Sequence, residues 1–266
     1  MVGLLFVGLG LFDDSDMSVA ALEAVRSADA VFAEFYTSRL SGTSLEGLEA
    51  RLGRPITVLD RRGVEEEPQA VLDAAGSGTA ALLVAGDPMA ATTHIDLRLR
   101  AEELGIPTRV FHAASILTAA LTELGLSAYK SGRVTTLQWP HGEYFPTSPY
   151  EQIVANHQAG LHSLVLLDIH SEEGRYMSAS EGCALLMRYE GMLGSGVTRP
   201  EDLACVISGA GSPDCVRRAD RFSILAGEDF GPALHAIVVP GSLHFMEARA
   251  LVVLAGADPQ LVGDAV

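Results

Sequence analysis

A carboxylate that directly follows an apolar run is the clearest candidate for chemistry in this sequence. Asp87 comes after the run 80–85, and Gly86 separates the two. The run lacks the polar alternation of a half-exposed strand, so we predict a buried strand of a parallel sheet. In open α/β sheets, ligands bind beyond the carboxyl ends of the strands, where a carboxylate can receive hydroxyls or an amine. The alternative is that Asp87 only shapes a turn with Pro88.

A second strand end carries another polar pair. Glu34 stands between apolar neighbours near the end of the predicted strand 30–35, and Tyr36 follows two residues later. Burial of a carboxylate without a partner costs several kcal/mol, so we expect Glu34 to lie in a cleft or in contact with solvent.

Short breaks of glycine and other small residues follow several predicted strands. Gly8-Leu9-Gly10-Leu11 ends the first strand, 4–7, and its glycines allow close approach of a ligand. A dinucleotide fingerprint would need a third glycine where Asp13 stands, which argues against a nicotinamide cofactor. The acidic cluster 13–16 is expected to cap a helix. Similar breaks suit an uncharged or zwitterionic ligand held by backbone and small side chains; they lie at 86–90, 115–116, 167–168 and 208–212.

Metal and hydrolase motifs are missing from the sequence. The eight histidines show no HExxH or similar spacing, and neither a GxSxG elbow nor a phosphate-binding P-loop occurs. The three cysteines form no CxxC pair, so we expect idle or buried thiols in a reducing compartment, at Cys183, Cys205 and Cys215. We therefore predict no metal site.

Strands and helices alternate through the first hundred residues, which predicts a parallel sheet with right-handed crossovers. Thr92 or Thr93 is expected to cap the helix after Asp87, which continues through Ile95, Leu97, Leu99 and Ala101. The acidic run 65–67 is expected to open the preceding helix. The pattern changes after residue 132, and further strands are predicted at 134–137, 164–167, 203–207 and 235–239.

Composition excludes several classes of protein. The chain has 266 residues, 48% hydrophobic and 20% charged, as in a packed globular protein. Its net charge is 18 − 34 = −16, which argues against direct binding of nucleic acid through phosphates. We see no signal peptide and no apolar run long enough to span a membrane, so we expect a cytoplasmic protein.

Read together, these segments resemble the diphthine synthase family, part of the two-domain tetrapyrrole-methylase superfamily of S-adenosylmethionine-dependent methyltransferases. The match covers nearly the whole chain; its runs at 31–38 (VFAEFYTS) and 86–94 (GDPMAATTH) are specific, whereas the GLGL opening alone is weak. Ser131 departs from the family, which usually has an aromatic residue after Tyr-Lys, and this leaves the local pocket shape open. The other runs that carry the resemblance are 16–18, 112–116, 145–148, 167–169 and 228–231.

The resemblance implies two α/β domains, an N-terminal one with a parallel sheet and a C-terminal one with a mixed sheet, with a cofactor cleft between them. We place the domains at 1–112 and 113–266. The resemblance further implies a homodimer that uses S-adenosyl-L-methionine. Its substrate would be translation elongation factor 2, on which the amino group of an aminocarboxypropyl-histidine is methylated repeatedly to give diphthine, in diphthamide biosynthesis.

Motif position carries the family's cofactor contacts to Leu11, Asp87, Ala90, Ser115, Ile116, Leu167, Ala210 and His235. Methyl transfer from a sulfonium to an amine is a direct displacement, so it needs no covalent protein nucleophile, and positioning alone can lower the barrier by about 7–11 kcal/mol. We hypothesise that Asp87 helps to orient the cofactor and that Glu34 or Tyr36 places or deprotonates the amine. Structural packing is the alternative for both residues.

Two rival functions remain open at this point. A relative of the same fold could methylate a tetrapyrrole or another small metabolite, and a bulky arginine-lined cavity for propionates would favour it. A non-catalytic binding module that keeps the cleft is the other rival. Calorimetry with S-adenosylmethionine separates these, because a silent titration would favour the binding module.

Overall fold

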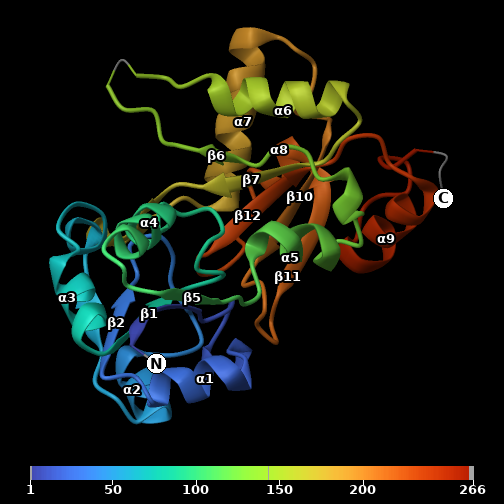
Figure 1. Cartoon of the computed structure of the whole chain (residues 1–266). Coiled ribbons are helices and arrows are strands. Elements are labelled where there is room, and N and C mark those ends of the chain that lie inside the picture. The colour runs from blue at the N-terminus through green and yellow to red at the C-terminus, as the bar shows by residue number, and fades with distance from the viewer. Residues whose placement is uncertain (1, 143, 264–266) are drawn as a thin grey trace. The chain divides into compact units, whose positions relative to one another are not determined.

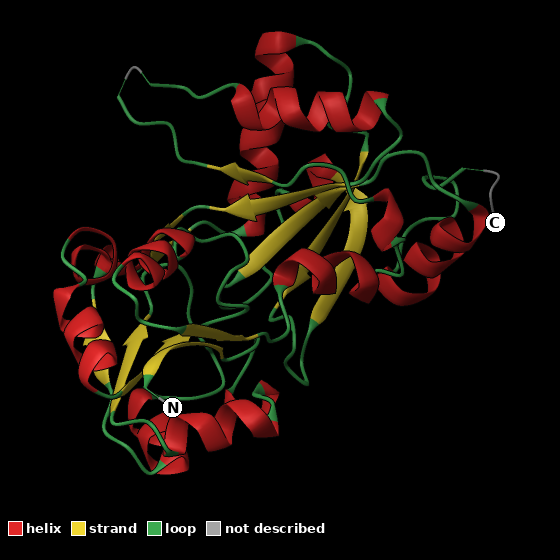
Figure 2. Ribbon diagram, in the orientation of Figure 1, coloured by secondary structure: helices red, strands yellow, loops and turns green. Residues whose placement is uncertain are grey.

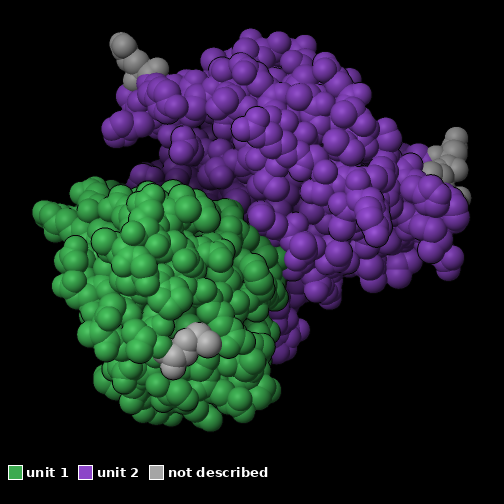
Figure 3. Space-filling view, in the orientation of Figure 1, with its two compact units in different colours: residues 1–116, 171–174 green, residues 117–170, 175–266 purple. Residues whose placement is uncertain are grey.

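The computed structural model of the chain describes residues 2–142 and 144–263. The chain forms two compact units (Figure 3). Unit 1 contains the residues up to Ile116 together with Ser171–Gly174, and unit 2 contains Leu117–His170 and the residues from Arg175 onward. The domain boundary after residue 112 stays a prediction, and by internal contacts the first unit continues to Ile116 and takes in a short piece of the later chain.

Unit 1 is built on a five-stranded parallel sheet in the order β3-β2-β4-β1-β5, as the alternation of strands and helices predicted. The central strand β4 is apolar throughout because both of its faces are buried. Ala81 and Leu83 face one core, and Ala80, Leu82 and Val84 face the other. The strands are β1 (Gly3–Gly8), β2 (Ala30–Glu34), β3 (Thr57–Leu59), β4 (Thr79–Val84) and β5 (Thr108–Phe111), and Figure 1 labels β1, β2 and β5.

Helices cover both faces of this sheet. Residues of α1 (Val19–Arg26) and α2 (Leu45–Leu52) pack on the face of Ala81, and residues of α3 (Gln69–Ser77) and α4 (Ile95–Glu103) pack on the opposite face. The unit also contains short helical turns, among them η1 (Asp14–Asp16) and the π-turn η2 (Arg62–Glu66).

Two details of the α4 and α3 predictions were wrong. His94 occupies the N-cap position of α4, so neither Thr92 nor Thr93 does. The helix itself runs through the four predicted residues, of which Leu97 and Ala101 are buried and Ile95 and Leu99 are about half exposed. The acidic run 65–67 does not open α3, because it lies in and just after η2 and the helix begins at Gln69.

Unit 2 contains a mixed five-stranded sheet in the order β11-β10-β12-β7-β6, and Figure 2 shows its strands in yellow. The β6–β7 pair is parallel and the other pairs are antiparallel, which confirms the mixed sheet that the resemblance implied. A two-stranded ribbon joins β8 (Ile169–His170) to β9 (Arg175–Tyr176). The sheet strands are β6 (Thr135–Leu137), β7 (Ser163–Leu167), β10 (Leu203–Ser208), β11 (Val216–Arg221) and β12 (His235–Val239).

The longest helix of the described residues, α7 (Ala179–Leu193), begins at a capping box formed by Ser178 and Glu181 and ends at Gly194 in the left-handed conformation. Its buried side chains share the core of unit 2 with α6 and α8. None of the helices in the described ranges has the length and apolarity that a membrane span requires. The other helical segments are α5 (Ile116–Glu123), η3 (Ala128–Lys130), α6 (Ser148–Gln158), η4 (Ser171–Glu173), α8 (Phe222–Leu225) and α9 (Phe245–Ala255).

Candidate functional site

The turns after β1 and β4 are joined by their backbones. Gly86 donates its amide to the Gly10 carbonyl at 2.7 Å, and Gly10 donates to the Gly86 carbonyl at 3.3 Å. Gly86 has φ +78° and Gly10 has φ +80°, and a Cβ on Gly10 would lie 2.1 Å from the Cβ of Asp16. Glycine is therefore required at Gly10 by both conformation and space.

Asp16 fixes the predicted contact residue Leu11. Its Oδ2 atom accepts the Leu11 amide at 2.9 Å and the Phe12 amide at 3.3 Å. Asp13 caps η1 by accepting the Ser15 amide. The acidic cluster after β1 thus orders the turn and presents Leu11 at the carboxyl end of the parallel sheet.

Asp87 is tied to two neighbouring segments and is only 11% exposed in its side chain. Its Oδ1 atom accepts the Met89 amide at 2.9 Å, as a turn-shaping aspartate does. Its Oδ2 atom accepts from Nδ1 of His112 at 2.8 Å and from the Ala113 amide at 3.3 Å. The carboxylate therefore links the end of β4 to the end of β5. The Ala90 amide donates to the Asp87 carbonyl at 3.2 Å and continues the turn.

Glu34 is completely buried, so the expectation of a cleft or of solvent contact was wrong. Its Oε2 atom accepts the amides of Tyr36 and Thr37, each at 3.1 Å, and Oε1 accepts the Thr37 hydroxyl. Three donors from Tyr36 and Thr37 satisfy a carboxylate whose partners could not be identified from the sequence.

Tyr36 is also buried, at 7% exposure. Its hydroxyl makes no well-formed hydrogen bond within the described residues. Burial and the nearby carboxylates of Glu34 and Glu65 raise the pKa of this phenol above its usual range. The side chain therefore stays protonated at neutral pH and suits hydrogen-bond donation better than proton abstraction.

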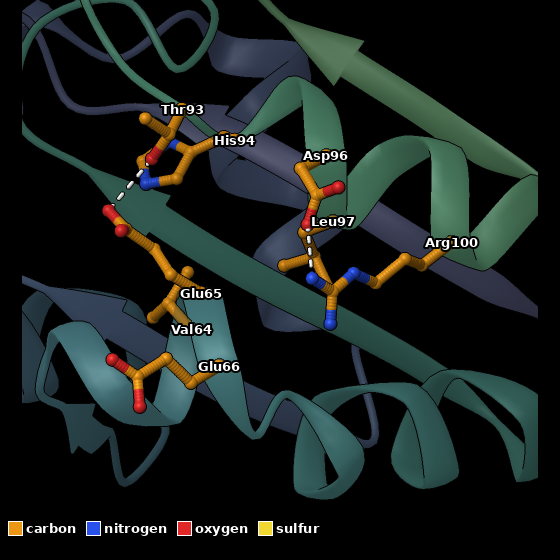
Figure 4. A pocket seen from close by; sticks show the side chains of 8 residues that line it. All are labelled: Val64, Glu65, Glu66, Thr93, His94, Asp96, Leu97 and Arg100. Carbon is orange, nitrogen blue, oxygen red and sulfur yellow. Dashed lines mark hydrogen bonds and ion pairs between the residues drawn. The ribbon is translucent and has the colours of Figure 1, made fainter.

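A pocket of about 350 Å³ is lined by residues of η2 and of the chain from Thr93 into α4 (Figure 4). It lies between η2 and the start of α4 in unit 1. The Thr93 hydroxyl donates to Glu65 at 2.8 Å, and Arg100 pairs with Asp96 at 2.7 Å. The lining is rich in carboxylates and its one arginine is already paired; the lining residues are Val64, Glu65, Glu66, Thr93, His94, Asp96, Leu97 and Arg100.

The predicted contacts of unit 1 gather beyond adjacent strands. Leu11 follows β1, Asp87 and Ala90 follow β4, and Ser115 follows β5, and these three strands are neighbours in the order β4-β1-β5. Ile116 is the last residue of the main segment of unit 1 and the first of α5. The carboxyl edge of the parallel sheet therefore brings these residues to one side of the unit.

The three predicted contacts of unit 2 also lie at one end of neighbouring strands. Leu167 ends β7, Ala210 follows β10, and His235 begins the antiparallel strand between them, paired with Ser208. His235 accepts the Ala179 amide at Nδ1 (3.1 Å), so Nε2 carries the proton and donates it to a carbonyl. Burial lowers the pKa of this histidine and keeps it neutral.

The described residues hold no cluster of three or more His, Cys, Asp or Glu side chains that could bind a metal ion. Burial raises the pKa of the Cys183 thiol to about 12 and raises that of Cys205 further. Both thiols are buried, in line with the expectation from the sequence, and Cys215 is partly buried.

Sequence reasoning missed the contacts that support the site. The sequence assigned Asp16 to a capping cluster but did not show that its carboxylate holds the turn at Leu11. It also did not show the Thr93–Glu65 hydrogen bond, which joins residues 28 positions apart. The signal available was local, because Gly10 and the aspartate that leaves no room for a Cβ there lie only six positions apart.

Comparison with known proteins identifies the family. The sequence pattern of the Tetrapyrrole (Corrin/Porphyrin) Methylases matches residues 3–214. The diphthine synthase of Methanothermobacter thermautotrophicus is 48% identical over 259 residues, which are 97% of this chain and 98% of that protein. The diphthine synthase of Halorubrum lacusprofundi is 47% identical over 271 residues, 97% of this chain and 99% of that protein.

A solved structure agrees with these sequence relatives. The crystal structure of a diphthine synthase superposes with a TM-score of 0.89 and 38% sequence identity, and the match covers 97% of this chain and 98% of that one. The chain therefore belongs to the tetrapyrrole methylase family of S-adenosylmethionine-dependent methyltransferases and, within it, to the diphthine synthases.

Proposed function

We propose that this methyltransferase uses S-adenosyl-L-methionine to methylate repeatedly the amino group of an aminocarboxypropyl-histidine on translation elongation factor 2, giving diphthine. The observation that carries the proposal is the gathering of Leu11, Asp87, Ala90 and Ser115 beyond three adjacent strands of unit 1. Ligands of open α/β sheets bind at such strand ends. The relatives are named diphthine synthases, which supports diphthine as the product.

The residues fit a methyl donor that carries a sulfonium charge beside a zwitterionic amino-acid group. Asp87 offers a carboxylate that is held in place by His112 and the Ala113 amide, and the joined turns at Gly10 and Gly86 have no Cβ to obstruct a ligand. We propose that eight residues hold the donor: Leu11, Asp87, Ala90, Ser115 and Ile116 of unit 1, and Leu167, Ala210 and His235 of unit 2.

Bound S-adenosylmethionine would supply an electrophilic methyl group that an amine displaces directly. The chain then needs to hold the amine unprotonated and in line, which can lower the barrier by about 7–11 kcal/mol. The raised pKa of Tyr36 favours a role in placing the amine, as a hydrogen-bond donor or through its neighbours, over a role as a base. Glu34 spends its oxygens on Tyr36 and Thr37, so it acts by fixing that turn.

The rival substrate class finds less support in the described pocket of unit 1. Propionate groups of a tetrapyrrole would need cationic partners, whereas Glu65, Glu66 and Asp96 line this pocket and Arg100 is paired with Asp96. We further propose that the enzyme works as a cytoplasmic homodimer that does not bind nucleic acid directly, in keeping with its net charge of −16.

The test incubates the protein with isotope-labelled S-adenosylmethionine and elongation factor 2 that carries the unmethylated aminocarboxypropyl-histidine. We expect a mass gain in whole methyl units on that residue, and no gain on a factor whose histidine is unmodified. Binding of the donor without any mass gain would favour a small-metabolite substrate. A calorimetric titration without any heat of donor binding would favour the non-catalytic module.

A further inference from the structure

Two family-typical runs of this sequence meet at one buried contact. Glu34, from the run 31–38, and His94, from the run 86–94, are 0% and 1% exposed. Nε2 of His94 lies 3.5 Å from Oε1 of Glu34. The contact joins the end of β2 to the end of the loop that follows β4, and both belong to unit 1.

The other ring nitrogen of His94 closes the loop that begins with Asp87. Nδ1 lies 3.1 Å from the carbonyl oxygen of Pro88, and because a carbonyl only accepts, Nδ1 carries the proton. Within the closed loop Ala91 has φ +55°, the one described non-glycine residue in the left-handed region. Such a conformation costs free energy and persists where surrounding contacts impose it.

Both ring nitrogens of His94 therefore face acceptors. Nδ1 donates to the Pro88 carbonyl, and Nε2 lies 3.5 Å from Oε1 of Glu34 without a hydrogen-bond partner among the described residues. Glu34 in turn holds the backbone of Tyr36 and Thr37. One buried pair thus fixes the turn at Tyr36 and the loop from Pro88 to His94.

We propose that Glu34 and His94 are positioning residues that fix the Asp87–Ala90 turn and thereby set the affinity for the methyl donor. The proposal rests on the proposed function, in which Asp87 and Ala90 contact S-adenosylmethionine. Neither Glu34 nor His94 touches the ligand in this account, because both side chains are fully buried. Their effect passes through the Pro88 carbonyl.

The first experiment measures donor affinity by calorimetry in the variants His94→Ala and Glu34→Gln. We expect the Kd for S-adenosylmethionine to rise about ten-fold for His94→Ala, as for loss of one buried hydrogen bond, with a much smaller change in kcat at saturating donor. His94→Asn supplies an amide at the position of Nδ1, so it should restore most of the affinity. His94→Gln places its amide nearer Glu34 and should restore less.

Unit 2 provides a matched control. His162 is fully buried and contacts the carboxylate of Glu247 at 3.0 Å, but it lies on no loop that carries a predicted donor contact. His162→Ala should lower the melting temperature by several degrees and leave the Kd for the donor unchanged. A fall in melting temperature for His94→Ala with an unchanged Kd would make the Glu34–His94 pair purely structural and overturn the proposal.

A ligand-free measurement separates this proposal from the proposed function. Hydrogen exchange of the Met89 and Ala90 amides should quicken in His94→Ala and Glu34→Gln and stay slow in His162→Ala. If exchange quickens in these variants but the wild-type protein does not bind the donor, the proposed function is wrong, whereas the Glu34–His94 pair still fixes the loop from Pro88 to His94. Unchanged exchange would overturn the proposal that the Glu34–His94 pair fixes this loop. If His94→Ala does not fold, His94→Asn and Glu34→Gln provide the same test.

Discussion

Glu34 in unit 1 and Glu247 in unit 2 are buried glutamates that each contact a buried histidine, and the two histidines differ in the partner of their second nitrogen. His162 donates from Nε2 to Glu247 at 3.0 Å and accepts the Gly241 amide at Nδ1, also at 3.0 Å. A neutral imidazole satisfies both contacts, and burial lowers the pKa of His162 accordingly. This pair is complete without any other charge on the ring.

The His94 ring lacks that match, because Nδ1 faces the Pro88 carbonyl and Nε2 faces Glu34. A neutral ring has one N–H and can satisfy only one of the two acceptors. Glu247 also accepts from Lys130 and from the amides of Ser127 and His244, so it joins several segments of unit 2. A buried Glu–His pair therefore has a purely structural role in unit 2. In our proposal, the corresponding pair in unit 1 also fixes the loop that carries Asp87 and Ala90.

Acid should have the largest effect on unit 2. Hydrogen bonds hold the pKa of Glu247 and of Glu190 at about 2 although burial opposes this; the donors to Glu247 include the His244 amide and Lys130. The folded-state pKa lies below the unfolded value of 4.5, so this stability is present above pH 4.5 and is lost as the pH falls toward 2. Each group contributes up to roughly 3 kcal/mol, because a ten-fold change in an acid dissociation constant corresponds to about 1.4 kcal/mol.

The sole tryptophan, Trp139, lies in unit 2 and reports its unfolding by fluorescence. We expect the urea midpoint of this unit to fall steeply between about pH 5 and about pH 3, where the two carboxylates begin to lose the stability that they contribute. A midpoint that stays level over this range would contradict the account of the two buried carboxylates.

The variant Glu247→Gln should have the next largest effect. It leaves Lys130 and His162 without their buried carboxylate, and removal of one partner of such a pair costs about 3 kcal/mol or more. The acid dependence should flatten by the share that Glu247 contributes. Glu123→Gln is the control, because the Glu123–Arg217 pair is 37% exposed on both sides and should cost under about 1 kcal/mol. Equal losses of unfolding free energy in the two variants would show that Glu247 is no more important to unit 2 than an exposed ion pair.

The sequence predicted the parallel sheet of unit 1 because its apolar runs and turn residues carry local signals. It did not predict β11, since Val216–Arg221 is an edge strand with three arginines and one aspartate. It also placed Glu34 in a cleft or in contact with solvent, because two of its three hydrogen-bond donors are backbone amides and the histidine beside it lies 60 residues further on. Motif spacing can place a residue at a strand end, but the partner that satisfies a buried side chain depends on the folded chain.

The variant Asp87→Asn addresses the unit 1 side of the comparison. The amide can still accept the Met89 amide at one oxygen but loses the negative charge that faces His112. We expect the Kd for S-adenosylmethionine to rise at least about ten-fold, since hydrogen bonds to charged groups are worth about 1.5–3 kcal/mol. His112 is 71% exposed, so His112→Ala shows whether this effect passes through the histidine. An unchanged Kd in Asp87→Asn would leave Asp87 with its turn-shaping role alone.

The smallest effect on stability is expected for Tyr36→Phe. The Tyr36 hydroxyl has no well-formed partner among the described residues, so its removal should change the free energy of unfolding by under about 0.5 kcal/mol. The matched variant in unit 2 is Tyr150→Phe, because the Tyr150 hydroxyl donates to Glu190 at 2.7 Å and accepts the Ser195 amide at 3.1 Å. Its loss should cost about 1–3 kcal/mol.

We expect the opposite order of effects on the rate of methyl transfer, with Tyr36→Phe the more harmful of the two variants. If the Tyr36 hydroxyl helps to place the amine, Tyr36→Phe slows single-turnover methylation while the Kd for the donor holds, and Tyr150→Phe leaves the transfer rate as it was. Because burial and the nearby glutamates raise the pKa of Tyr36, its ionisation should not appear in the pH dependence of that rate below about pH 10. Unchanged transfer in both Tyr36→Phe and Glu34→Gln would reduce these two residues to packing, and the buried hydroxyl of unit 1 would then need another explanation than catalysis.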